Sequence, residues 1–302
     1  MLQKELRKLI WIFLVPPLIV WGIINIYPMV SSFYWALTSY DGINPASAVF
    51  TGIENYQRMV SDVRWLDSIK NTFAIAIGMI VTILPLSLVF AFLITMTKKG
   101  QNVLKALVYL PSILPVVIVS LLWVFILDPT VGIFGFTLDA LNLREFLRAT
   151  FHLRTLHLVG NPSTARYVII LITLWSALGF YTLIFLAGLS RIPQDLYDAA
   201  RIDGAEGLSL FRYVTFPLLY PTIQTVLLLL IINALQSFTF VYVVTGGFPG
   251  PTTQVMATYI YGKGFKDYQF GYATALGTVM MVIVLAFTLL SRRLTKREVI
   301  QY

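Results

Sequence analysis

The sequence predicts an all-α integral membrane protein with six transmembrane helices, and two observations carry this prediction. Hydrophobic residues make up 58% of the 302 residues and charged residues only 12%, whereas a soluble protein carries roughly a quarter. Six apolar segments without Lys, Arg, Asp or Glu are long enough to cross a bilayer, which takes about 20 helical residues. Because these segments follow one another along the chain, we expect a single transmembrane domain over residues 1–302.

The first predicted span, residues 9–37, follows the basic residues Lys4, Arg7 and Lys8. It is far longer than the apolar region of a cleaved signal peptide, about 7–15 residues, so we expect it to be retained. Several prolines lie within the spans, and membrane helices tolerate proline where neighbouring helices satisfy the freed carbonyl groups. The other predicted spans are residues 71–96, 106–127, 167–190, 214–244 and 272–290.

The positive charges predict which loops face the cytoplasm. More than half of the 22 Lys and Arg residues lie near the two termini and in the segments after the second and fourth spans, although the remaining segments are longer in total. Basic residues are enriched in short cytoplasmic segments, so this distribution places both termini in the cytoplasm. The net charge of +8 is explained in the same way, without nucleic-acid binding.

A charged segment separates the fourth and fifth spans and must lie in water. Pro193 suits the first turn of a helix, and Asp195 favours the positively polarised N-terminal end. Asp203 and Gly204 are typical of a C-terminal stop. We therefore predict a short cytoplasmic helix over about residues 193–208.

Polar side chains inside the spans mark candidate sites, because hydrocarbon makes them costly unless they are paired or face water. Two predicted helical faces combine such side chains with aromatic rings. They are Thr173, Ser176 and Phe180 on the fourth span, and Asn233, Gln236, Ser237 and Phe240 on the fifth. Opposed across a cavity, these faces suit a neutral polyol or sugar. The alternative is hydrogen bonding between helices, worth under about 1 kcal/mol per contact; it is favoured for the single Ser and Thr, whereas the Asn–Gln–Ser cluster fits both interpretations equally.

Several chemistries are absent from the sequence. The spans hold none of the acidic or basic residues that ion-coupled carriers usually place at membrane depth. There is no Cys, no G-x-x-x-x-G-K-[ST] phosphate loop, no H-E-x-x-H and no G-x-S-x-G. The chain is therefore not predicted to be an enzyme, and as a transporter it needs a motor that docks from the cytoplasm. A secondary carrier of a neutral polar solute and a non-transport membrane scaffold are the alternatives.

The charged segment also carries a spaced motif. It reads Asp198-Ala199-Ala200, three residues, Gly204, nine residues and Val214-x-Phe216-Pro217. This spacing resembles the EAA signature of the membrane subunits of binding-protein-dependent ABC importers, which reads E-A-A, three residues, G, nine residues and I-x-L-P. Asp203-Gly204-Ala205 and Phe211 also fit the form common in the sugar permeases. Asp198 replaces the Glu of the signature and is one methylene shorter, which reduces the reach of any contact made there.

Shorter motifs extend the resemblance over most of the chain, to the first-subunit type of maltose and lactose permeases. They are Phe50-x-Gly52-x-x-Asn55-Tyr56, Asn71-Thr72, Thr245-Gly246-Gly247-x-Pro249, Tyr259-Ile260-Tyr261 and Gly271-Tyr272-Ala273-x-Ala275. The resemblance implies a type I ABC importer fold, like that of the maltose permease, in the bacterial cytoplasmic (inner) membrane. It also implies that the chain forms the translocation pathway for a sugar or oligosaccharide.

The same resemblance implies partners and residue roles. The charged segment would be a coupling helix held in a cleft of a separate ATPase. Its coupling residues would be Asp198, Ala199, Ala200, Asp203, Gly204, Ala205, Phe211 and Pro217. The sugar pathway would lie at Thr173, Ser176, Phe180, Asn233, Gln236 and Ser237. The expected partners are a second homologous permease subunit, two ABC ATPase subunits, an external solute-binding protein, a carbohydrate substrate and membrane lipid, with no nucleic acid. ATP and magnesium would bind the ATPase subunits, and no cofactor or metal is expected on this chain.

Overall fold

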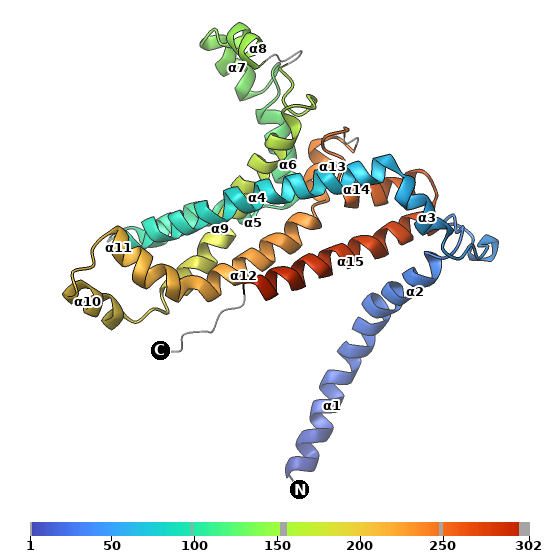
Figure 1. The fold of residues 1–302 in the computed structure, drawn as a ribbon, viewed down its shortest axis with the longest axis horizontal. Helices are drawn as coiled ribbons and strands as arrows, with labels where there is room; N and C mark the ends of the chain where they lie inside the picture. Colours follow the sequence, from blue (N-terminus) through green and yellow to red (C-terminus); the bar gives the residue numbers. More distant parts are fainter. Residues whose placement is uncertain (1, 98, 152–155, 248–249, 296–302) are drawn as a thin grey trace. The chain divides into compact units, whose positions relative to one another are not determined.

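The computed structural model describes residues 2–97, 99–151, 156–247 and 250–295. Among these residues there is no extended strand, and one antiparallel bridge pairs Thr38 with Phe50. Lys98, Lys296 and Arg297, which contribute to the predicted orientation, and Pro249 of one motif lie outside the described residues. The helices of Figure 1 are α1 (Leu2–Trp21), η1 (Gly22–Ile26), α2 (Tyr27–Trp35), η2 (Pro45–Ser47), α3 (Glu54–Ser61), α4 (Val63–Met96), α5 (Gln101–Ile113), α6 (Val116–Ile126), α7 (Ile133–Ala140), α8 (Arg144–Phe151), α9 (Ala165–Leu189), α10 (Gln194–Ile202), α11 (Leu208–Leu210), η3 (Phe211–Thr215), α12 (Phe216–Leu235), α13 (Thr239–Val244), α14 (Met256–Tyr261), η4 (Gly262–Lys266) and α15 (Phe270–Leu294).

Five helical stretches of the described residues are long and apolar enough to span a membrane. They are Ile10–Trp35, Val63–Met96, Ala165–Leu189, Leu208–Leu235 and Phe270–Leu294. A sixth span exists when α5 and α6, which meet at an angle of 94°, are counted together as one broken span. The predicted all-α membrane class is confirmed, and the third of its spans is bent.

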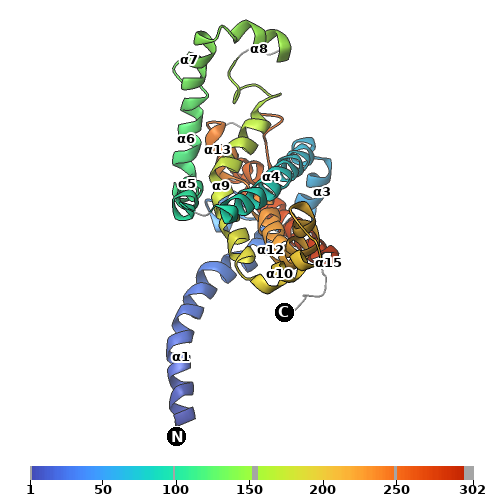
Figure 2. The ribbon, with the colours of Figure 1, turned by 90° about the vertical axis from the view of Figure 1, so that its left-hand side faces the viewer.

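The bend between α5 and α6 lies at Leu114 and Pro115. Leu114 has an extended backbone with ψ 139°, and Pro115 directly precedes the first residue of α6. Proline has no N–H to donate and disfavours helical backbone in the residue before it, so α5 cannot continue past Ile113. Figure 2 shows α6 rising steeply from the end of α5.

The predicted fifth span, residues 214–244, is not one continuous helix, which corrects the sequence interpretation. α12 ends at Leu235, and α13 begins at Thr239. Gln236 and Ser237 lie in the break, so they do not continue the helical face of Asn233. Non-helical backbone at membrane depth is tolerated where it lines a cavity.

The chain divides into two compact units. The first comprises Met1–Trp65 and Tyr259–Ile283, and the second comprises Leu66–Thr258 and Val284–Tyr302. One boundary between the units, at Trp65 and Leu66, falls within α4, and another, at Ile283 and Val284, falls within α15. Each of these two helices therefore contributes residues to both units.

In the first unit, residues of the short motifs join neighbouring segments. Asn55 of α3 donates its side-chain amide to the backbone oxygens of Ala36 and Thr38, at 2.9 and 2.8 Å. The Gly271 N–H donates to the backbone oxygen of Tyr40 at 2.8 Å. A Cβ at Gly271 would lie 2.0 Å from the Thr38 oxygen, so the close approach requires glycine. These motif positions therefore serve packing.

Asp62, between α3 and α4, is a carboxylate that joins several segments of the same unit by hydrogen bonds. Its Oδ2 accepts hydrogen bonds from the hydroxyls of Tyr259 and Tyr272, both at 2.6 Å. Its Oδ1 accepts from the Trp65 N–H at 3.2 Å. The guanidinium of Arg58 lies over the Tyr272 ring, 4.2 Å from the centroid. Two tyrosines that belong to the motifs thus hold one carboxylate.

In the second unit, α9 contacts α5, α6, α12 and α13 (Figure 1). Two glycines allow close approach. A Cβ at Gly179 would lie 2.2 Å from the backbone oxygen of Val108 in α5, and one at Gly188 would lie 2.4 Å from Thr222 Oγ1 in α12. Because it packs on four neighbours, α9 is the helix around which this unit is built.

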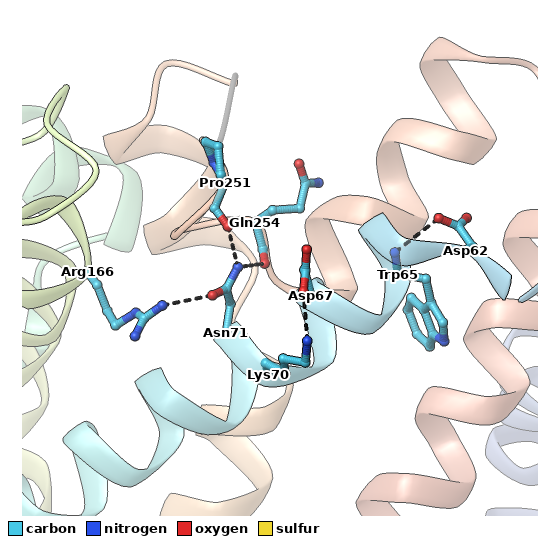
Figure 3. A network of polar contacts seen from close by, with 8 residues as sticks. All are labelled: Asp62, Trp65, Asp67, Lys70, Asn71, Arg166, Pro251 and Gln254. Atoms are coloured by element: carbon cyan, nitrogen blue, oxygen red, sulfur yellow. Dashed lines mark hydrogen bonds and ion pairs between the residues drawn. The ribbon is translucent and has the colours of Figure 1, made fainter. Parts of the chain in front are cut away.

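A polar network in the same unit joins the first part of α4, the start of α9 and the loop before α14 (Figure 3). Asn71 donates its amide to the backbone oxygens of Pro251 and Gln254, at 2.7 and 3.0 Å. Arg166 donates to Asn71 Oδ1 at 2.8 Å and to the Thr252 oxygen at 3.3 Å. Asn71, a motif residue, thereby fixes the loop to two spans.

Candidate functional site

The second unit contains a cavity of about 400 Å³. Residues of α4, α5, α6, α9, α12 and α13 and of the break after α12 surround it. Its lining consists of Met79, Ile83, Ser112, Val116, Thr173, Ser176, Ala177, Phe180, Tyr181, Leu230, Asn233, Ala234, Gln236, Ser237, Phe238, Thr239 and Phe240. All six residues predicted for the sugar pathway are among them. Among the described residues, no Asp, Glu, Lys, Arg or His lines the cavity. Its size is within the range of small-molecule sites.

The α9 side of the cavity combines hydroxyl groups with aromatic rings. The Thr173 hydroxyl donates to the Ile169 oxygen of its own helix at 2.8 Å. Phe180 is 43% exposed and packs edge-on against Tyr181, with ring centroids 5.2 Å apart. The backbone oxygen of Ser176 accepts a hydrogen bond from Ser112 Oγ at 2.6 Å. This wall can therefore offer aromatic surface and hydroxyl groups to a ligand without presenting a charge.

The α12 side contains the Asn–Gln–Ser cluster. Asn233 donates its amide to the Tyr181 hydroxyl at 3.0 Å, which links α12 to α9. This is a hydrogen bond between helices, as the packing interpretation of the Asn–Gln–Ser cluster predicted. It involves Asn233 but neither Gln236 nor Ser237. Ser237 Oγ is buried and has no hydrogen-bond partner among the described residues. A buried hydroxyl without a partner is costly, and Ser237 lies in the non-helical break beside the cavity.

The sequence interpretation did not include Tyr181 and Ser112. Tyr181 adjoins Phe180 but falls outside the helical repeat that begins at Thr173. Ser112 belongs to the third span, where no cluster of polar residues draws attention to it. The sequence signal that could have identified Ser112 is its position between two prolines, Pro111 and Pro115, in an apolar span.

The charged segment between α9 and α12 begins with α10, Gln194–Ile202. The helix ends at Ile202 rather than near residue 208 as predicted. Gly204 has φ +84° and donates to the Arg201 oxygen at 3.0 Å, and the Ala205 N–H donates to the Ala200 oxygen at 2.9 Å. This pair of bonds is a Schellman motif, which satisfies the last carbonyls of a helix and stops it. Glycine is favoured there because side chains strain a left-handed backbone.

Most of the predicted coupling residues on α10 and the following turn are exposed. Asp198 and Arg201 form an ion pair with 2.7 Å between Oδ1 and Nη1, in which both side chains are more than half exposed. Ala199, Asp203 and Gly204 are exposed, and Ala200 and Ala205 are half-buried. Ile202 is 87% exposed and Leu208 is 79% exposed. Small side chains beside exposed apolar ones make a surface that another protein can approach closely.

The remaining predicted coupling residues, Phe211 and Pro217, lie beyond α10, in η3 and α12. Tyr197 and Thr215 share a hydrogen bond of 3.3 Å between their hydroxyls, which ties α10 to η3. The Phe211 ring packs edge-on against Phe92 of α4, with centroids 5.6 Å apart. Pro217 lies near the start of α12, directly after η3, and has no backbone N–H to donate. α10 is therefore linked through η3 to the start of α12.

Spans that surround an uncharged cavity, together with an exposed helix on a loop, define a multi-pass membrane protein of the transport class. The family model described as "Binding-protein-dependent transport system inner membrane component" matches residues 83–299. The chain belongs to this family of inner-membrane permease subunits, which are transport proteins rather than enzymes.

Relatives and solved structures agree with this assignment. The chain is 33% identical to the trehalose/maltose transport system permease protein MalF of Thermococcus litoralis, over 95% of this chain and 94% of that protein. It is 29% identical to the diacetylchitobiose uptake system permease protein NgcF of Streptomyces coelicolor, over 92% and 79%. A bacterial ABC transporter involved in the import of the acidic polysaccharide alginate has the same fold, with a TM-score of 0.82, 24% identity and coverage of 97% and 98%.

Proposed function

We propose that this chain forms part of the translocation pathway for a neutral sugar or oligosaccharide in an ATP-driven importer. The observation that carries the proposal is the cavity of about 400 Å³, which is lined by amide, hydroxyl and aromatic groups and by no acidic or basic side chain of the part of the chain that the structure describes. Such a lining suits a ligand with many hydroxyls and no charge. Two relatives are named for the transport of trehalose and maltose and of diacetylchitobiose, which are uncharged sugars.

The proposed assembly contains a second homologous permease subunit, two ABC ATPase subunits and an external solute-binding protein. ATP and magnesium bind the ATPase subunits, and this chain carries no cofactor. The family description, which names binding-protein-dependent transport, supports an external binding protein. Both termini face the cytoplasm in this proposal, in agreement with the distribution of basic residues.

In the same proposal, α10 is the coupling helix that docks in the ATPase. Asp198 exchanges its exposed partner Arg201 for a basic residue of the ATPase, at little cost because exposed ion pairs are worth under about 1 kcal/mol. Ala199 and Ala200 allow a close approach of the two backbones. Gly204 makes the turn that leads back to the spans, so that ATP-driven closure of the ATPase moves α12.

Uptake by the complete transporter in sealed vesicles tests the driving force. We expect labelled sugar to accumulate only when ATP is present on the cytoplasmic side, with the binding protein on the other side. Uptake that continues without ATP but with an ion gradient would support a secondary carrier and refute the proposal. Absence of any uptake by the assembled complex would support the scaffold alternative.

Two substitutions test the coupling helix. Asp198→Lys and Gly204→Val are expected to abolish ATP-dependent uptake or assembly with the ATPase while the chain stays in the membrane. Asp67→Lys is the matched control, because Asp67 also forms an exposed ion pair with a basic residue three positions later, Lys70. Normal ATP-dependent uptake in both α10 variants would exclude the coupling role.

A double substitution tests the cavity. Asn233→Leu with Gln236→Leu removes two amides and is expected to reduce uptake tenfold or more, by about 1 kcal/mol for each lost hydrogen bond, with ATPase docking unchanged. Asn25→Leu is the control, because Asn25 bonds only the Trp21 oxygen of its own helical stretch. Unchanged affinity and rate in the double variant would assign both amides to helix packing.

A further inference from the structure

Ser112, in the last turn of α5, is hydrogen-bonded to the backbone of α9. Its Oγ donates to the Ser176 oxygen at 2.6 Å and accepts from the Phe180 N–H at 3.2 Å. These two backbone groups are the acceptor and the donor of one i→i−4 step of an α-helix. The Ser112 hydroxyl therefore competes for both ends of a single backbone hydrogen bond in α9.

Gly179 brings the two helices close enough for this contact. A Cβ at Gly179 would lie 2.2 Å from the Val108 oxygen and 2.6 Å from the Tyr109 Cα. Both are backbone atoms of α5, so a side chain at this position would push the helices apart. The close approach and the hydroxyl contact occur on the same turn of α9.

Two prolines lie at the end of α5 and shortly after it. Pro111 and Pro115 lie on either side of Ser112 and have no N–H to donate. The chain then turns by 94° into α6. A side chain inserted into an i→i−4 ladder is a known cause of helix bending. Ser112 thus lies beside the bend between α5 and α6 and contacts one turn of α9.

The contact lies at the cavity, on the helix that leads to the charged segment. Ser112, Ser176 and Phe180 all line the cavity, and α9 continues from there to Leu189, shortly before α10 begins at Gln194. We propose that Ser112 is a positioning residue that makes this turn of α9 a hinge, through which movement of α10 reshapes the cavity. This inference rests on the proposed function of the cavity and of α10.

The physical basis is that the hydroxyl offers a second partner to two backbone groups. A turn of helix that opens normally leaves an N–H and a C=O unpaired, which is costly away from water. With Ser112 in place, the Phe180 N–H and the Ser176 oxygen stay hydrogen-bonded whether the turn is open or closed. The hydroxyl therefore lowers the free energy of the open turn relative to the closed one.

The Ser112→Ala variant of the complete transporter tests the hinge. The direct backbone bond in α9 remains possible without the hydroxyl, so we expect the variant to fold. The number of sugar molecules imported per ATP should fall by about threefold to tenfold, the effect of one hydrogen bond. Ser112→Thr keeps a hydroxyl and should restore most of the ratio. Ser120→Ala is the matched control, because Ser120 Oγ donates to the Val116 oxygen within α6 at 2.8 Å.

A distance measurement reports on the hinge directly. The chain has no Cys, so spin labels can be attached at Tyr167→Cys and Ser190→Cys, near the two ends of α9 and about 35 Å apart. ATP binding should change the distance between the labels in the protein with Ser112, and Ser112→Ala should suppress this change.

Two results would overturn the inference. The first is an unchanged ratio of sugar to ATP in Ser112→Ala; if the apparent KM for sugar rises at that unchanged ratio, Ser112 is a direct substrate contact instead. The second is the same ATP-dependent distance change in both proteins. The label distance is measured in response to ATP and does not depend on which solute is carried. A complex that imports no sugar would therefore refute the proposed substrate, and the distance measurement would still test the hinge.

Discussion

Asp62 shows how a single carboxylate can hold several segments of a membrane protein together. Burial opposes its ionisation, but the hydrogen bonds donated by Tyr259 and Tyr272 outweigh this effect and lower the pKa of Asp62. Burial, followed by the bond to Asp62, raises the pKa of Tyr259. A charged acceptor therefore faces neutral donors at neutral pH, and hydrogen bonds to charged groups are the stronger kind.

The lowered pKa of Asp62 predicts a pH-dependent stability. The stabilisation is fully present above the unfolded-state pKa of about 4 and is lost as the pH falls through the lower folded-state value. We expect Asp62→Asn to lower the free energy of unfolding by about 1–3 kcal/mol at pH 7. The difference from the unsubstituted protein should shrink below about pH 4. Thermal unfolding of the detergent-purified protein at several pH values measures both effects.

Asp67→Asn is the control for this prediction. Asp67 pairs with Lys70 at 3.0 Å, but its side chain is 52% exposed, so we expect a loss below about 1 kcal/mol. If Asp62→Asn were equally destabilising at pH 7 and pH 3, the role of Asp62 would depend on shape rather than on charge.

At the scale of helices, the crossing of α5 and α9 depends on Gly179. Gly179→Ala places a Cβ against backbone atoms of α5, and overpacking of this kind costs about 1–3 kcal/mol. Gly277→Ala in α15 is the matched control, because a Cβ there meets no atom within 4 Å. Since Ala favours helix over Gly by about 1 kcal/mol, the control should be as stable as the unsubstituted protein or more so. Thermal unfolding compares the two, and equal stability would contradict the close crossing.

The helix boundaries show which local signals suffice. Asp203 and Gly204 gave the local stop signal of α10, because a glycine with positive φ stops a helix by local hydrogen bonds alone, but the predicted helix extended past this signal to about residue 208. The right-angle bend at Pro115 and the break at Gln236 were not predicted. Both spans read as continuous apolar runs, and whether a proline or a polar pair interrupts such a run depends on the neighbouring helices that satisfy the freed backbone groups.

For the whole molecule, the distribution of basic residues predicts the orientation in the membrane. Because the chain lacks Cys, single cysteines can be introduced at exposed positions of α8 and α10. An impermeant thiol reagent should label Glu145→Cys in intact cells and Gln194→Cys only after permeabilisation, since the basic segment is expected in the cytoplasm. The reverse pattern would invert the proposed topology and remove α10 from reach of a cytoplasmic ATPase.

The short motifs on which the family resemblance rests consist largely of residues that hold the fold together. Asn55, Gly271, Tyr259 and Tyr272 hold the first unit together, and Asn71 anchors a loop of the second. None of them lines the cavity. Their identities reflect packing and hydrogen-bonding demands, whereas the cavity is formed by residues that no single motif contains.

The sequence by itself determined the membrane class, the six apolar spans, the exposed charged segment and the polar residues that line the cavity. These features depend on composition, spacing and helix capping, which act over a few neighbouring residues. Only the tertiary structure decided that Tyr181 pairs with Asn233, that Ser112 reaches the backbone of α9, and that Gln236 and Ser237 lie in a break. The two contacts join residues that are tens of positions apart, and the break interrupts an apolar run, so all three depend on how the helices pack against one another.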